Sequence, residues 1–157
     1  MLRQGIQTNF KHVDLKTWGC YWFTLAAWSQ FVSLKEWTDD DLIEKFEEHR
    51  KKNWINRTER DPFDGKIYPW ARHPVAIFND MAGVPDYFIG VDHSKDDKDF
   101  PKTKRFPVFY KRPKRDGFDH FALGELDQNG NVRIVFDSWQ NSAAARGTPI
   151  HNFRKFR

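Results

Sequence analysis

Residues 18–34 carry no charged side chain and are apolar at almost every position. A segment that is apolar on all sides is typical of a helix buried in the middle of a domain. The segment is at the short limit for a membrane span. Four of its side chains are polar: Thr24, Ser29, Gln30 and Ser33. We therefore predict a buried helix at about 20–33 and no membrane span.

Two further helices are predicted by apolar side chains at helical spacing. In residues 39–53 the apolar stripe consists of Leu42, Ile43, Phe46 and His49. Thr38 is a suitable N-cap for this amphipathic helix. A shorter helix at 73–82 is indicated by Pro74 at its first position and by Gly83 as its terminator.

The segments around these helices are predicted from turn residues and polarity. Residues 1–17 are polar and mixed, which indicates an extended lead-in with one short strand. Turn dipeptides predict a loop at 55–72. Residues 87–91 have the composition of a strand, and the charged residues 92–104 indicate an exposed loop.

The second half of the chain has the alternating pattern of β-strands. Phe106, Val108 and Tyr110 alternate with other residues, and further strands are predicted at 118–126 and 132–136. Between these two, residues 127–131 (DQNGN) form a hairpin turn signal. The tail, 141–157, has small residues and then a basic aromatic end. Helices followed by an antiparallel sheet predict one α+β domain that covers residues 1–157.

The composition restricts the class of protein. With 157 residues, 39% hydrophobic and 31% charged, the chain fits a single soluble domain, and 17% aromatic residues suggest a core or groove built from rings. One cysteine excludes an internal disulfide and favours a reducing compartment. We identify no apolar signal segment and expect a cytoplasmic protein. The net charge of +4 favours anionic surroundings only mildly.

Two charged clusters have an ordinary and a functional interpretation. The acids between Asp92 and Asp99 suggest calcium, but they lack the spacing and the glycine of a calcium loop, so a solvated charge run is favoured. The basic residues 111–115 suit either an anionic polymer or a surface turn. No nucleic-acid motif is present, and acids at 39–41 and 92–99 interrupt any basic face, so we expect no nucleic-acid partner.

Cys20 is the residue with the clearest chemical potential. It would lie in the first turn of the buried helix, where unpaired N–H groups and the helix dipole stabilise a thiolate. Gly19 before it would leave space for a substrate carbonyl. The alternative is that Cys20 is a small buried hydrophobe.

His120 is the best candidate for a base that acts on Cys20. It lies inside a predicted strand, and the antiparallel partner strand would bring Asp137 close enough to orient its ring. Trp139 would shield this pair from water. The alternatives are a core histidine bonded to a carbonyl, a turn-capping aspartate and a core tryptophan. The six histidines form no metal pattern with Cys20, so we expect no cofactor.

Three short motifs resemble papain-like cysteine peptidases. Residues 19–23 (GCYWF) are similar to the nucleophile segment that opens the central helix of that family. Residues 119–124 (DHFALG) resemble its histidine strand. Residues 137–139 (DSW) resemble its Asn-Ser-Trp, with Asp in place of Asn as in bacterial relatives of the bacteriocin-processing, C39-like type.

The resemblance implies a fold and a set of roles. The fold would be papain-like, with N-terminal helices and a central catalytic helix packed on a C-terminal antiparallel sheet. Cys20, His120 and Asp137 would form the triad, and Trp18, Gly19 and Trp139 would contact substrate. The family places an oxyanion-stabilising Gln six residues before the Cys, where this chain has Asp14. Gln7 is the candidate replacement, and a solvated surface amide is its alternative role.

The implied activity is hydrolysis of peptide or amide bonds. Charge, size and the triad point to a phage-type endolysin that acts on peptidoglycan peptides and reaches the wall through a phage lysis system. A protein-processing peptidase and cell-wall amidases of the CHAP or NlpC/P60 kind are the alternatives among enzymes. A papain-like binding module with weak or lost catalysis is the alternative outside them, and Asp14 favours it.

Overall fold

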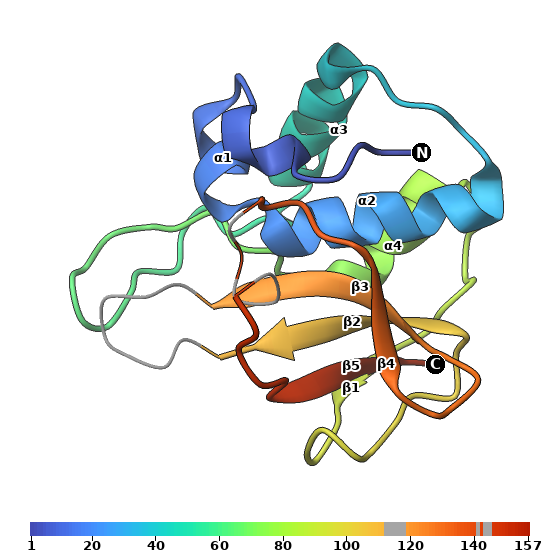
Figure 1. Cartoon of the computed structure of the whole chain (residues 1–157). Coiled ribbons are helices and arrows are strands. Elements are labelled where there is room, and N and C mark those ends of the chain that lie inside the picture. Colours follow the sequence, from blue (N-terminus) through green and yellow to red (C-terminus); the bar gives the residue numbers. More distant parts are fainter. Residues whose placement is uncertain (112–118, 141, 143–145) are drawn as a thin grey trace.

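A layer of helices covers an antiparallel β-sheet in the computed structural model, which describes residues 1–111, 119–140, 142 and 146–157 (Figure 1). The helices are η1 (Ile6–Asn9), α1 (Val13–Trp18), α2 (Cys20–Ser33), α3 (Asp39–Lys51) and α4 (Pro74–Ala82). The strands are β1 (Val91–His93), β2 (Arg105–Tyr110), β3 (His120–Leu126), β4 (Val132–Phe136) and β5 (Asn152–Phe156). This arrangement confirms the predicted α+β class.

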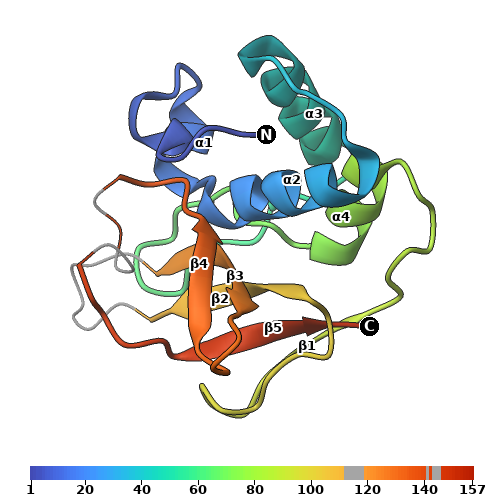
Figure 2. The same ribbon diagram turned by 45° about the vertical axis from the view of Figure 1, so that its right-hand side comes forward.

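The predicted buried helix is α2, and it lies between the sheet and helices α1 and α3 (Figures 1 and 2). Residues 22–30 are all buried. The Trp28 ring lies 4.7 Å from that of Phe78 in α4 and 5.0 Å from that of Phe156 in β5, between ring centroids. Because α2 contacts both layers, it needs apolar side chains all round. In the described part of the chain, every helix is too short or too polar to cross a bilayer.

The ends of α3 and α4 lie close to where local signals place them. Thr38 and Asp41 form a reciprocal capping box at the start of α3. The Thr38 backbone nitrogen lies 3.0 Å from Oδ2 of Asp41, and the Asp41 backbone nitrogen lies 3.1 Å from Oγ1 of Thr38. The buried side chains of α3 are Leu42, Phe46 and His49. Helix α4 begins at Pro74 and ends before Gly83, whose φ of 69° suits a residue without a Cβ.

The sheet has the strand order β1-β5-β2-β3-β4, and every neighbouring pair is antiparallel. The predicted strands at 106–110, 118–126 and 132–136 are confirmed as β2, β3 and β4, although Phe118 lies outside the described residues. The β3–β4 hairpin closes where Asp127 N–H donates to the carbonyl of Asn131 at 2.8 Å. This hairpin places the start of β3 beside the end of β4.

Two strand predictions need correction. The strand expected at 87–91 begins only at Val91, because the side chain of Asn79 bonds both backbone groups of Phe88 and removes them from any ladder. No strand is predicted in the tail, but β5 lies there, between β1 and β2 of the sheet. An alternation of buried and exposed residues would have predicted this strand. In β5 that alternation is broken, because Phe153 and the adjacent Arg154 are both buried.

The predicted short strand in the lead-in is also wrong. Residues 1–17 form η1 and most of α1, and the ring of His12 caps α1 by accepting from Leu15 N–H at 3.3 Å. The lead-in nevertheless binds the chain that follows β4. Gly5 N–H donates to the Asp137 carbonyl and Gln7 N–H to the Ser138 carbonyl, both at 2.8 Å.

Candidate functional site

The first turn of α2 carries Cys20, which is half-buried. Gly19 is both the C-cap of α1 and the N-cap of α2, so the two helices meet at this residue. A Cβ at Gly19 would lie 2.4 Å from the carbonyl oxygen of Leu15. Glycine is therefore required here by the helix junction itself, whether or not a substrate also uses the space.

The structure brings His120 and Asp137 together. Nε2 of His120 lies 2.7 Å from Oδ1 of Asp137, although the residues are 17 positions apart. Asp137 comes one step after the Leu123–Phe136 register pair of β3 and β4, so the two side chains are diagonal neighbours across the hairpin. The chain that leaves β4 passes the first turn of α2 in both views (Figures 1 and 2).

The carboxylate of Asp137 is held by more than the histidine. Its Oδ1 also accepts the backbone N–H of Trp139 at 3.1 Å, and its Oδ2 accepts the hydroxyl of Ser142. Gln4 supports the same residue from the lead-in, because its Oε1 accepts Asp137 N–H at 2.8 Å. Three donors on the carboxylate fix its orientation and keep it a good partner for an imidazolium.

His120 also interacts with Cys20, and this interaction changes the pKa of His120. The side chain is only 4% exposed, and burial alone would lower its pKa. Hydrogen bonds and charge interactions with Asp137 and Cys20 outweigh burial and raise the pKa of His120 to about 9. Since Nε2 is bound to Asp137, Nδ1 is the nitrogen left for the thiol. The arrangement favours an imidazolium beside the sulfur of Cys20.

Tyr110 covers the histidine from β2. It is the register partner of His120, and the two rings are stacked with centroids 6.4 Å apart. Burial and the charge of Asp137 raise the pKa of Tyr110 to about 12, so its hydroxyl stays protonated in the neutral range. Tyr110 therefore limits access of water to His120 without adding a charge.

Gln7 and Asp14 occupy positions that the sequence does not reveal. Gln7 is completely buried, so the surface-amide interpretation is wrong. Its Oε1 accepts the hydroxyl of Ser138 at 2.7 Å, and its Nε2 donates to the carbonyl of Lys16 at 3.0 Å. Gln7 thus lies against the turn that precedes Cys20. Asp14 pairs with Arg50 of α3, which compensates its charge.

Trp18 lies two residues before the start of α2, at Cys20. The ring of Trp18 packs on that of Tyr68, with centroids 4.4 Å apart. Tyr68 belongs to the loop at 55–72, which extends past this end of the helix (Figure 1). Trp139 is half-buried, and its backbone N–H binds Asp137 as described above.

The two charged clusters have different outcomes. In the acidic segment, Asp92 binds Arg157 at 3.1 Å and Asp99 binds Lys155 at 2.8 Å, so these carboxylates serve as ion-pair partners. Among the described residues, no group of three or more His, Cys, Asp or Glu side chains is arranged to hold a metal ion. Of the basic cluster, residues 112–115 lie outside the described residues.

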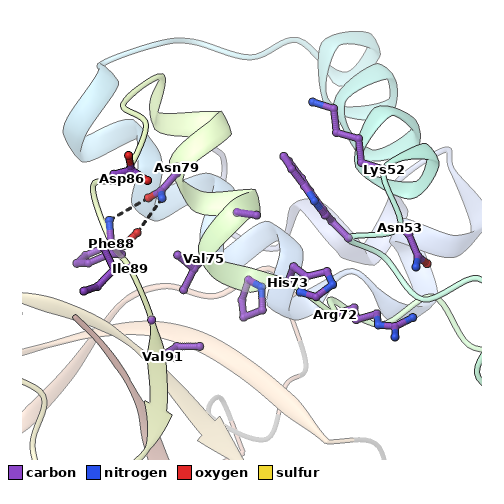
Figure 3. A pocket seen from close by; sticks show the side chains of 14 residues that line it. Lys52, Asn53, Arg72, His73, Val75, Asn79, Asp86, Phe88, Ile89 and Val91 are labelled. Carbon is purple, nitrogen blue, oxygen red and sulfur yellow. Dashed lines mark hydrogen bonds between the residues drawn. The ribbon is translucent and has the colours of Figure 1, made fainter.

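A separate groove of about 660 Å³ lies between the end of α3, the start of α4 and the segment before β1 (Figure 3). Its wall combines the basic Lys52 and Arg72 with the rings and aliphatic groups of residues such as Trp54 and Ile89. The amide of Asn79 faces the Phe88 backbone in this view. Neither Cys20 nor the His120–Asp137 pair lines the groove.

Sequence reasoning missed Tyr110 and Ser142, which contact His120 and Asp137 respectively. The position of Tyr110 could have been predicted from the sequence. It ends an alternating strand that pairs with the strand of His120, so the two residues can lie opposite each other. Ser142 carried none, since it lies in a tail of small residues with no periodicity. Its contact with Asp137 arises from the path of the chain after β4.

Comparisons with protein-family models, with curated proteins and with solved structures give no match for this chain.

Proposed function

We propose that this chain is a papain-like cysteine hydrolase that cleaves peptide or amide bonds with Cys20 as nucleophile, His120 as acid and base, and Asp137 as the residue that orients the histidine. The observation that carries the proposal is the continuous set of contacts from Cys20 through His120 to Asp137. A thiol at a helix N-terminus with an oriented imidazole is the arrangement that activates sulfur for attack.

The first half of the reaction forms a thioester. The Cys20 thiolate adds to the carbonyl carbon, and the carbonyl oxygen becomes an oxyanion. The Cys20 N–H in the first turn of α2 is positioned to stabilise this charge, with Gln7 as the proposed second donor. The imidazolium of His120 then gives its proton to the leaving amine as the carbon–nitrogen bond breaks.

The second half releases the acyl group. His120, now neutral, takes a proton from water, and the resulting hydroxide adds to the thioester carbon. The carbon–sulfur bond breaks and gives a carboxylic acid, while the sulfur leaves as thiolate beside the imidazolium. Asp137 keeps the ring in one orientation through both halves.

Peptidoglycan peptides are the substrate class that we propose. The net charge of +4 favours an anionic wall polymer, and a single small domain is typical of phage endolysins. The purified protein is expected to clear a suspension of bacterial cell walls, and Cys20→Ala is expected to abolish clearing. Alkylation of Cys20 reports separately on the thiol, since no other cysteine is present.

The two parts of the proposal fail differently in this experiment. Rapid, His120-dependent alkylation without wall clearing would contradict the peptidoglycan substrate and leave a protein-processing peptidase, which peptide libraries then test. Slow alkylation that His120→Ala does not change would contradict the hydrolase itself.

A papain-like binding module is the second candidate, and the environment of Gln7 favours it. The amide is completely buried and bonded at both ends, so it reaches a substrate oxyanion less readily than an exposed donor. This module would bind wall fragments through the aromatic side chains near Trp18. Binding of wall fragments by Cys20→Ala, combined with slow alkylation of the native protein, would support it.

A further inference from the structure

The two residues that follow the proposed nucleophile and base stack on each other. The rings of Tyr21 and Phe121 have centroids 4.0 Å apart and planes inclined by 10°. Tyr21 is bonded directly to Cys20, and Phe121 directly to His120. A contact between these rings therefore limits how far the two reacting side chains can move apart.

A buried hydroxyl joins the same two backbone segments. Oγ1 of Thr24 lies 2.8 Å from the carbonyl oxygen of Cys20 and 3.3 Å from that of Phe121, so its single proton is shared between them. Thr24 is completely buried. The start of α2 and the start of β3 are thus joined by a polar contact as well as by the stack.

A buried cation supports Phe121 within the sheet. The guanidinium of Arg154 lies 5.0 Å from the centroid of the Phe121 ring and 4.6 Å from that of Phe109. Arg154 is only 8% exposed, and its Nη1 is anchored to Oδ1 of Asn152 at 2.7 Å. A desolvated cation beside aromatic rings stabilises them in one position.

The hydroxyl of Tyr21 adds nothing to this arrangement. It is buried and has no hydrogen-bond partner among the described residues, and burial raises the pKa of Tyr21. A buried hydroxyl without a partner is unfavourable. The ring of Tyr21, and not its polar group, is therefore what the site uses.

We propose that Tyr21 and Phe121 are positioning residues that hold Cys20 against His120 through their ring stack. This inference rests on the proposed function in taking Cys20 and His120 as nucleophile and base. A displacement of about 1 Å between reacting groups costs about 100-fold in rate, so even a small loosening of the stack has a measurable effect.

The test is the pH dependence of Cys20 alkylation in variants of the full chain. Tyr21→Leu and Phe121→Leu remove the stack but keep an apolar side chain, and each is expected to slow alkylation at pH 6.5 by about tenfold or more. Tyr21→Phe keeps the ring and is expected to retain the native profile. Phe109→Leu is the matched control, because it removes a ring under Arg154 that is not adjacent to either reacting residue.

The outcomes separate this inference from the proposed function. A native pH profile in folded Phe121→Leu would overturn the inference, and so would a Tyr21→Phe profile as slow as that of Tyr21→Leu. If Tyr21→Leu does not fold, Phe121→Leu and Tyr21→Phe decide. Loss of the fast reaction in the stack variants of a protein that hydrolyses no peptide would support the inference while contradicting the proposed function.

Discussion

His49 and Asp80 form a second buried pair with the geometry of the candidate site. Nε2 of His49 lies 2.7 Å from Oδ2 of Asp80, the distance that also joins His120 to Asp137. The two histidines nevertheless differ in acidity. Burial lowers the pKa of His49, and Asp80 compensates only in part because it also binds Lys45 at 3.0 Å. His120 has Cys20 on its other side, and its pKa rises. Cys20 is one cause of this difference, since Asp137 and Cys20 both raise the pKa of His120.

The first prediction concerns how the reactivity of Cys20 depends on pH. Because the pKa of His120 is raised to about 9, its imidazolium persists through the neutral range beside the sulfur of Cys20. Alkylation by iodoacetamide at neutral pH should therefore be faster than that of an isolated thiol, because a positive charge beside sulfur promotes its attack. Hydrolysis should fall above about pH 9, where His120 loses the proton that the leaving amine needs.

The matched variant for this prediction is His120→Ala. Its alkylation rate should rise steadily with pH and be about 10- to 100-fold below that of the native protein at pH 6.5. His12→Ala, at a histidine bound to Glu47 on the far side of α1, controls for loss of a histidine alone. Coincident profiles for the native protein and His120→Ala would contradict the prediction.

The second prediction concerns the support of the histidine by Asp137. Asp137→Asn keeps the size of the side chain but removes its charge, so it should lower the pKa of His120 and move the pH above which hydrolysis falls to a lower value. One pH unit of displacement corresponds to about a tenfold change in the ionisation equilibrium.

Ser142→Ala removes one of the donors to Asp137 and should leave the carboxylate less well oriented, with a smaller loss of hydrolysis. A larger loss for Ser142→Ala than for Asp137→Asn would contradict this order.

The third prediction concerns the junction that presents Cys20. Gly19→Ala places a methyl group 2.4 Å from the carbonyl oxygen of Leu15, and backbone must move to accommodate it. Overpacking of this kind costs about 1–3 kcal/mol of stability. Chemical denaturation should show that loss, together with slower alkylation. The control is Gly65→Ala in the exposed loop, where nothing lies within 4 Å but the positive φ alone adds strain. A native alkylation rate in Gly19→Ala would show that the junction does not orient the thiol.

The parts of the fold that the sequence predicts are those with local signals. Helix α3 carries its own capping box, α4 its proline and glycine, and the β3–β4 hairpin its turn residues. The helix η1 and the residues before it bind residues 135–140, far away in the chain, so no local pattern reveals this helix. Strand β5 was missed because Arg154 is buried only where two aromatic rings accept it.

In the candidate site, too, some contacts follow from local sequence signals and others depend on packing between distant segments. The proximity of His120 and Asp137 follows from a hairpin that the sequence predicts, and the structure has the two side chains in contact. The contacts of Gln7 with Ser138 and Lys16 depend on how the lead-in docks beside the end of β4. Likewise, the stack of Tyr21 on Phe121 requires knowledge of how α2 lies on β3. Packing between layers, unlike pairing within a hairpin, leaves no periodic pattern in the sequence.

The last prediction concerns stability in acid, and it depends on His49. The residue is completely buried, accepts the indole N–H of Trp22 at 3.1 Å through Nδ1, and must be neutral to do so. Its pKa in the folded state lies below the ordinary 6.5, so the unfolded chain binds more protons once the pH falls below about 6.5. Stability is therefore present above that pH and is lost as the pH falls, with a slope that approaches about 1.4 kcal/mol per pH unit for one proton.

The raised pKa of His120 acts in the opposite direction, but only above about pH 6.5. Its contribution is complete below pH 6.5, where the residue is protonated in both states, and is lost only as the pH rises toward about 9. Urea denaturation at pH 6 and pH 5, where His120 is protonated in both states, should show a native protein that weakens on acidification. His49→Leu should be less stable at pH 6, since Trp22 and Asp80 lose their partner, but should weaken less between pH 6 and pH 5. The exposed His151→Gln should behave like the native protein. An acid loss in His49→Leu equal to that of the native chain would show that His49 is not the residue that titrates.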